Sequence, residues 1–139
     1  MRCTGIYSLK ADEKGRVKLP KRILNNIGSG ELYIVHMGTG RYRLYSPSEW
    51  ADIMKEMDQL PREDEYIVKR KILGGCNETM PDAQGRILLN RLNNCDEKAL
   101  FLVGAGRYCE IYTRSEWERI QTGIKIEEAE ALTNESKKQ

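Results

Sequence analysis

An internal duplication is the feature that most constrains this chain, because residues 5–50 align with residues 75–117. Four short motifs recur in the same order, with small changes of spacing that fall between them. The matching segments are Asp12 to Arg16 with Asp82 to Arg86, Leu24 to Ile27 with Leu92 to Cys95, Gly38 to Tyr42 with Gly104 to Tyr108, and Leu44 to Trp50 with Ile111 to Trp117. A repeat of this kind predicts two structurally equivalent units.

The composition is that of a soluble globular protein. Of the 139 residues, 40% are hydrophobic and 32% are charged, which is typical of a chain with a hydrophobic core. The net charge of +2 does not by itself indicate a polyanionic partner. No apolar run approaches the roughly 20 residues that span a bilayer, and the first residues are too few and too polar for a signal peptide. We therefore expect a cytoplasmic protein without membrane contact.

Signatures of metal, cofactor and catalytic sites are missing from the sequence. The four cysteines, Cys3, Cys76, Cys95 and Cys109, have no C-x-x-C spacing, and His36 is the only histidine. A zinc site is therefore disfavoured, and the cysteines are expected to be reduced thiols. We expect no cofactor and no small-molecule substrate. Because no metal cluster or nucleophile motif is present, we also expect that the chain is not an enzyme.

Each copy is predicted to fold as strand, turn, strand, short helix, hairpin and helix. In the Asp-x-x-Gly-Arg segment, Asp12 can cap backbone N–H groups of a type I turn, and Gly15 tolerates a positive φ. Pro20 can open the following short helix and Gly28 can close it. In the second copy Asn90 stands in place of the proline and can act as an N-cap.

A hairpin and a capped helix complete each copy. The hairpins are predicted over 32–37 and 41–45, and over 100–103 and 107–112. A one-residue shift in the alignment of the returning strands predicts a β-bulge in one copy. Capping boxes are present at 46–49 and 113–116. The tryptophans that follow them, Trp50 and Trp117, are expected to pack against the core rather than stack on nucleic acid.

These elements divide the chain into a first repeat with its C-terminal helix at 1–60, a helical connector at 61–74, a second repeat at 75–126 and a polar tail at 127–139. A strand–turn–strand unit of this size cannot bury its apolar face alone. The two copies should therefore complete one another. The simplest solution is a mixed α+β fold around a shared β-barrel with an internal pseudo-twofold axis.

The paired motifs resemble the SpoVT/AbrB swapped-hairpin proteins, and among them the MraZ family, whose members carry two such units in one chain. The resemblance covers residues 5–124, and its matching residues are Asp12, Gly15, Arg16, Leu19 and Pro20, with Asp82, Gly85, Arg86, Ile87 and Leu89. It implies a sequence-specific, nucleoid-associated transcriptional regulator that binds repeated promoter boxes of the cell-division and cell-wall gene cluster. It also implies a ring-shaped homo-oligomer that binds double-stranded DNA.

The same resemblance assigns the expected site residues. Arg16 and Arg86 are the expected DNA contacts, and the turns that carry them are supported by Asp12, Gly15, Asp82 and Gly85. Residues 10–22 have a local charge balance of +4, so Lys14, Lys18 and Lys21 are expected to contact phosphates. The second turn is less basic, which predicts that the neighbourhood of Arg16 contributes more to affinity than that of Arg86.

Alternative interpretations exist for each of these features. The two arginines can be structural partners of Asp12 and Asp82, and the lysines can lie on a solvated face. The Gly-x-Gly-Arg-Tyr segments can suggest a phosphate loop, but they lack the G-x-G-x-x-G spacing and are better explained as hairpin turns. At the level of function, the alternative is a protein-interaction or antitoxin-type oligomerisation module on the same fold.

Overall fold

The structure, a computed structural model, describes residues 2–28, 30–89, 97–121, 128 and 130–133. The first repeat contains β1 (Ile6–Lys10), β2 (Arg16–Lys18), α1 (Lys21–Ile27), β3 (Leu32–Gly38), β4 (Arg41–Tyr45) and α2 (Pro47–Asp58). The connector is α3 (Arg62–Gly74). The second repeat contains β5 (Cys76–Thr79), β6 (Arg86–Leu88), β7 (Ala99–Gly104), β8 (Cys109–Thr113) and α4 (Arg114–Gln121). The short helix and the cap predicted at 90–95 lie outside the described residues.

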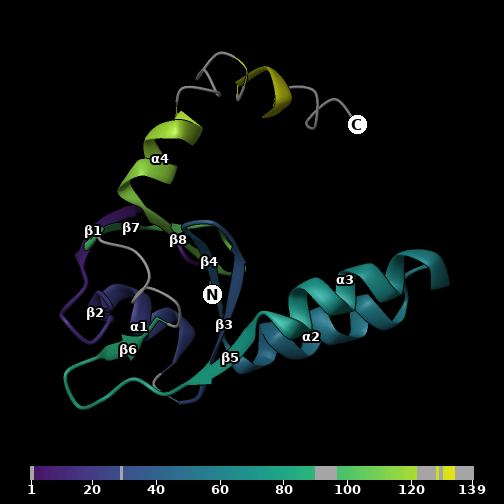
Figure 1. The fold of residues 1–139 in the computed structure, drawn as a ribbon, viewed down its shortest axis with the longest axis horizontal. Helices are drawn as coiled ribbons and strands as arrows, with labels where there is room; N and C mark the ends of the chain where they lie inside the picture. The colour runs from purple at the N-terminus through teal and green to yellow at the C-terminus, as the bar shows by residue number, and fades with distance from the viewer. Residues whose placement is uncertain (1, 29, 90–96, 122–127, 129, 134–139) are drawn as a thin grey trace.

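The strands of the two repeats are interleaved in a mixed α+β fold (Figure 1). One sheet has the order β1-β7-β8-β4-β3-β5, and a second, two-stranded sheet pairs β2 with β6. All of these pairings are antiparallel. Each repeat therefore supplies its first strand to the hairpin of the other repeat, so neither half has a complete sheet of its own.

The register of this exchange is the same in both directions. Ile6 of β1 pairs with Val103 of β7, and Cys76 of β5 pairs with Val35 of β3. Further along, Leu9 pairs with Leu100 and Thr79 pairs with Leu32. The backbone N–H of Gly104 donates to the carbonyl of Gly5 over 2.8 Å, and that of His36 donates to Gly75 over the same distance. The expected mutual completion of the two copies is present in these pairings.

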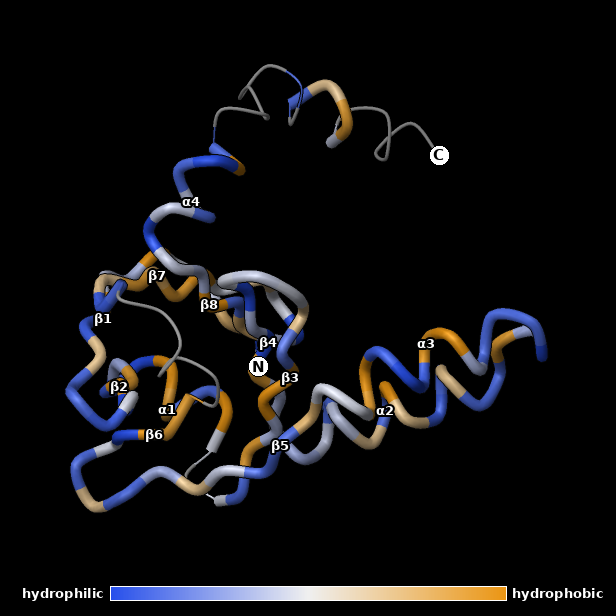
Figure 2. Tube along the Cα trace, in the orientation of Figure 1, coloured by the Kyte–Doolittle hydropathy of each residue, from blue (hydrophilic) through white to orange (hydrophobic). Residues whose placement is uncertain are grey.

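The main core lies between the two sheets and α1, where buried aliphatic side chains come from both repeats. Its fully buried members include Val17, Leu19, Ile23, Leu32, Leu44, Ile87, Leu89, Leu100 and Ile111. Burying each large aliphatic side chain contributes about 1.5–3 kcal/mol. Figure 2 shows the corresponding apolar segments on β2, β6 and α1.

A β-bulge distinguishes the first hairpin from the second, as the alignment predicted. The pairing of β3 with β4 shifts between His36 and Gly38, whereas β7 pairs with β8 without a shift as far as Gly104 and Cys109. The extra residue, Met37, lies on the outgoing strand rather than on the returning one. The bulge makes His36, and not Gly38, the structural counterpart of Gly104.

Helices flank the strands on two sides. The antiparallel helices α2 and α3 extend away from the sheets, and α4 projects from the end of β8 (Figure 1). Ser46 caps α2 by accepting a hydrogen bond from the backbone of Glu49, with Pro47 at the first helical position. Trp50 stacks on Tyr33 with ring centroids 5.3 Å apart. The predicted Ser46 cap and the packing role of Trp50 are thus confirmed. Among the described residues, none of the helices has the length and apolar character needed to span a membrane.

Candidate nucleic-acid interface

The first Asp-x-x-Gly-Arg turn is held together by one carboxylate. Oδ1 of Asp12 accepts hydrogen bonds from the backbone N–H groups of Lys14 and Arg16, both at 2.9 Å. Oδ2 accepts from Nε of Arg16 at 2.8 Å. The backbone closes the turn through Gly15, whose N–H donates to the Asp12 carbonyl. The φ of Gly15 is 81°, which is unfavourable for a residue that has a Cβ.

The second turn repeats this geometry. Oδ1 of Asp82 accepts from the backbone N–H groups of Gln84 and Arg86 at 2.9 Å, and Oδ2 accepts from Nε of Arg86 at 2.7 Å. Gly85 has a φ of 78°. The identical hydrogen-bond pattern explains why Asp, Gly and Arg recur at fixed spacing in both copies: each supplies one part that the turn requires.

The side chains of Arg16 and Arg86 are held by their aspartates but are only partly buried. Their side chains are 33% and 31% exposed, and each ion pair joins Nε of the arginine to the aspartate. A guanidinium has five N–H donors, so the groups on the two terminal nitrogens lie beyond this bond. Each arginine can therefore keep its ion pair with the aspartate and also bind a ligand. The aspartate accepts from Nε, and the two terminal nitrogens can donate to another acceptor.

The carboxylates of the turns are stabilised in their charged form. Hydrogen bonding from the backbone of Arg16 is the largest cause that lowers the pKa of Asp12 below its ordinary value of 3.8. The same contact from Arg86 lowers the pKa of Asp82. In both cases desolvation opposes the shift, while the arginine side chain and a second backbone N–H reinforce it. The aspartates therefore remain ionised and hold the arginines at neutral pH.

The two arginines share one face of the β2–β6 ribbon. Arg16 pairs with Leu88, Val17 with Ile87, and Lys18 with Arg86. Val17 and Ile87 are buried. Because side chains alternate between the faces of a strand, the other four point away from the core. Arg16, Lys18, Arg86 and Leu88 therefore form the outer face of the ribbon, which we call the ribbon face.

Strand exchange gives each arginine a neighbour from the other repeat. Lys18, exposed on β2, lies across from Arg86 and not beside Arg16. Helix α1 lies close to the second turn, since a Cβ added to Gly85 would lie 2.8 Å from Cδ1 of Leu24. Lys21, the first residue of α1, is exposed. The sequence does not reveal this arrangement, because Lys18 and Lys21 follow the first turn along the chain.

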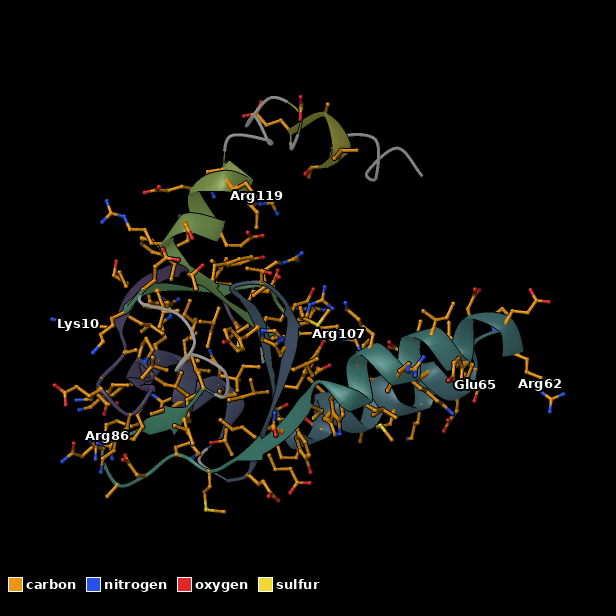
Figure 3. All side chains as sticks on the ribbon, in the orientation of Figure 1. Lys10, Arg62, Glu65, Arg86, Arg107 and Arg119 are labelled. Carbon is orange, nitrogen blue, oxygen red and sulfur yellow. The ribbon has the colours of Figure 1, made fainter. Side chains whose placement is uncertain are left out.

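The remaining predicted site residue, Lys14, lies at the tip of the first turn with its side chain exposed. Its counterpart in the second turn is Gln84, whose backbone makes the same bond to the aspartate. The first turn thus has a cation at its tip, and the second has Lys18 at its base. Figure 3 shows Arg86 at the end of the molecule opposite Arg62 of α3.

In the part of the chain that the structure describes, the other polar features suggest no competing site. The Gly38 and Gly104 segments occur at hairpin ends, as predicted. Among the described residues, no group of three or more histidine, cysteine or acidic side chains could hold a metal ion. Burial raises the pKa of the Cys76 thiol to about 11 and raises that of the Cys109 thiol further, which disfavours the nucleophilic thiolate.

Several known proteins are similar to this chain over most of its length. No family model matches it. It is 33% identical over 141 residues to the transcriptional regulator MraZ of Nitrosococcus oceani, with 94% of each chain covered. It is 32% identical to the protein of the same name from Caldanaerobacter subterraneus subsp. tengcongensis, with 94% of this chain and 96% of the relative covered. For that of Heliobacterium modesticaldum the identity is 31%, with 83% of each chain covered.

Interleaved hairpins with paired arginine turns, together with these relatives, define the class as transcriptional regulators. The coverage extends over both repeats and their connector in a single alignment. The chain belongs to the MraZ family, as the resemblance of its duplicated motifs predicted.

Proposed function

We propose that this chain is a sequence-specific DNA-binding transcriptional regulator that binds repeated promoter boxes of the cell-division and cell-wall gene cluster through its two Asp-x-x-Gly-Arg turns. The observation that carries the proposal is the common orientation of Arg16 and Arg86 on the ribbon face. Strand rise and spacing put their Cα atoms about 8 Å apart, close enough to address neighbouring base pairs.

The chemistry of the ribbon face fits the major groove. An arginine whose Nε is occupied can donate from its end to O6 and N7 of guanine, and a two-stranded ribbon fits within the groove. Lys14, Lys18 and Lys21 are exposed and can neutralise phosphates, which position a protein on DNA without specifying sequence. In this proposal the arginines specify bases and the lysines supply salt-dependent affinity.

The interleaved pairing supports a closed arrangement in which the two sheets form one β-barrel with a pseudo-twofold axis through the Val17–Ile87 pair. The units 1–60 and 75–126 are then the two halves of one barrel, joined by 61–74 and followed by the tail at 127–139. The axis would relate Arg16 to Arg86 and bring both turns to the same DNA surface.

A ring-shaped homo-oligomer would supply the avidity that one small site lacks. The exposed apolar side chains of α3 support self-association: Tyr66 is 66% exposed and Ile67 is 67% exposed. Sedimentation velocity tests this proposal. Ile67→Lys should lower the sedimenting mass, whereas Ile6→Lys, an equally apolar exposed position on β1, should not. An unchanged mass for Ile67→Lys would remove α3 from the interface.

Binding is tested by fluorescence anisotropy with duplexes from the promoter of that gene cluster and with shuffled duplexes of the same composition. Arg16→Ala and Arg86→Ala should each weaken the preference for the promoter duplex about 5- to 100-fold, because a good bidentate contact contributes about 1–3 kcal/mol of discrimination. Affinity should fall as salt rises. Arg114→Ala, at an exposed arginine of α4 that pairs with Glu118, is the matched control and should bind normally.

The second candidate function is a protein-interaction or antitoxin-type oligomerisation module, which the exposed α3 side chains also favour. Salt-insensitive or absent DNA binding by the intact oligomer would select that function instead. A cytoplasmic, nucleoid-associated location follows from the DNA-binding proposal and fails with it.

A further inference from the structure

The ribbon face is not symmetric, although the turns at its two ends are alike. If both repeats were identical, positions 18 and 88 would carry the same residue, because each follows its turn arginine by two positions. The first has Lys18 and the second has Leu88. Through the antiparallel register, Leu88 lies across from Arg16 and Lys18 lies across from Arg86. Each end of the ribbon face is thus composed of one residue from each repeat.

The geometry of the ladder brings these pairs into contact distance. The N–H of Leu19 donates to the carbonyl of Gly85, and that of Leu89 donates to Gly15. Bonded and non-bonded pairs alternate along an antiparallel ladder. The pairs at 16 and 88 and at 18 and 86 are therefore of the non-bonded kind, with Cα atoms about 4.5 Å apart and side chains close together.

Leu88 is an unusual residue for such a surface. It is 46% exposed, while its chain neighbours Ile87 and Leu89 are 1% and 2% exposed and belong to the core. It therefore adds little to the core, yet it places an apolar side chain beside a cation that is fixed by Asp12. In the major groove, the apolar group that such a side chain can contact is the 5-methyl of thymine.

Resting on the DNA-binding function proposed above, we propose that Leu88 is a specificity residue that contacts the methyl group of a thymine next to the base contacted by Arg16. At the opposite end of the ribbon face, Arg86 contacts a base and Lys18 contacts a phosphate. One subunit therefore recognises a box whose two halves differ: one half contains a thymine that must carry its methyl group, and the other tolerates substitution at the corresponding position.

The test uses the full chain and the duplex that it enriches from a random-sequence pool. Each thymine of that duplex is replaced singly by deoxyuridine, which lacks only the methyl group. For the unsubstituted chain, one replacement should weaken binding about fourfold, the equivalent of one buried methyl group. For Leu88→Ala the same replacement should have no effect, and affinity for the thymine duplex should already be lower by a similar factor.

Two reciprocal variants serve as matched controls. Leu88→Lys places an arginine and a lysine at both ends of the ribbon face. This variant should lose the thymine requirement. Its plot of log K against log salt should be steeper by about 0.9, as expected for one more phosphate contact. Lys18→Leu makes both ends Arg with Leu. It should keep the thymine requirement and flatten the salt dependence by about the same amount. Positions 18 and 88 are both exposed, and circular dichroism verifies that each variant folds.

The outcomes separate the two proposals. If no duplex is enriched, or if binding survives Arg16→Ala unchanged, the DNA-binding function fails. If specific binding is present but no deoxyuridine replacement matters, or if the same penalty persists in Leu88→Ala and Leu88→Lys, the role of Leu88 is overturned while the function stands.

Discussion

Lys18 of the first repeat lies directly across the β2–β6 ribbon from Arg86 of the second. The sequence places Lys18 two positions after Arg16 and so suggests that it belongs to the first turn. In the structure β2 carries it away from that turn and toward the other one. Charge that is contiguous in sequence is thus divided between the two ends of the ribbon face, and the expected dominance of Arg16 loses one of its premises.

This relationship leads to a revised expectation for the two arginines. Arg86→Ala should cost at least as much DNA affinity as Arg16→Ala, because Arg86 acts beside a second cation and Arg16 acts beside Leu88. Anisotropy titrations of both variants on one duplex, at one salt concentration, measure the difference. If Arg16→Ala were tenfold more damaging than Arg86→Ala, the sequence-based expectation would be restored and Lys18 would have no role at the second turn.

Local structure could be predicted from the sequence, while the pairing partners could not. The turn geometry of Asp12 and Gly15, the Ser46 cap and the hairpins all depend on residues within a few positions of one another, and each matches its prediction. The neighbours of Lys18 and Leu88 depend on register between segments about 70 residues apart. No local pattern encodes that register, because it is fixed by the shared core.

The hairpin alignment shows the same limit on a smaller scale. Gly38 and Gly104 match by sequence because both precede a Gly-Arg-Tyr segment. In the structure the counterpart of Gly104 is His36, since the bulge inserts Met37. A bulge could be predicted from the change of spacing, but its strand could not, because an inserted residue can be accommodated on either side of the turn.

The turn carboxylates should make stability depend on pH below 3.8. Folding lowers the pKa of Asp12 and Asp82 below that ordinary value. Their stabilising contribution is therefore fully present above 3.8 and is lost as the pH falls through the lowered values. The double variant Asp12→Asn with Asp82→Asn should be less stable than the unsubstituted chain at neutral pH, and this difference should shrink in acid.

Urea unfolding at a series of pH values measures this effect. An asparagine keeps one oxygen for the backbone donors, but its amide N–H₂ would face Nε of the arginine, so the variant loses the charged contact. Asp52→Asn, at an exposed position of α2, is the control and should follow the unsubstituted chain at every pH. Parallel curves for the double variant and the unsubstituted chain would show that the turn carboxylates do not contribute.

Gly40→Ala should destabilise the protein more than Gly38→Ala. Both glycines have a positive φ, 66° and 127°, so either substitution strains the backbone by about 1–3 kcal/mol. At Gly40 the new Cβ would also lie 2.4 Å from Oγ1 of Thr113, whereas at Gly38 nothing lies within 4 Å. The buried threonine has to move, which adds about 1–3 kcal/mol.

Amide hydrogen exchange in α4 distinguishes backbone strain at the glycine from the steric clash with Thr113. Oγ1 of Thr113 accepts a hydrogen bond from the backbone of Glu116 at the start of α4. Gly40→Ala should therefore speed amide hydrogen exchange in the first turn of α4, and Gly38→Ala should not. Equal unfolding free energies together with an unchanged α4 would mean that Thr113 adjusts without cost.

Arg107→Ala should loosen α2 from the second hairpin without affecting the ribbon face. Arg107 lies between β8 and the α2–α3 pair (Figure 3), where Nε bonds Glu49 at 3.0 Å and a terminal nitrogen bonds Glu56 at 3.1 Å. The hydrogen bond to Glu49 is the largest cause that raises the pKa of Arg107, and the bond to Glu56 adds to it. They connect the two repeats outside the sheets, so their loss should increase hydrogen exchange in α2 and α3 selectively.

The effect on global stability should be small, because Arg107 and Glu56 are exposed, Glu49 is partly exposed, and such ion pairs are screened by water and salt. Arg114→Ala is the matched control: Arg114 makes an exposed ion pair with Glu118 within α4, so it connects no separate elements. It should leave exchange in α2 unchanged. DNA affinity should be the same for both variants and the unsubstituted chain. A loss of affinity in Arg107→Ala alone would instead indicate that the orientation of the α2–α3 pair controls how subunits present their ribbon faces to DNA.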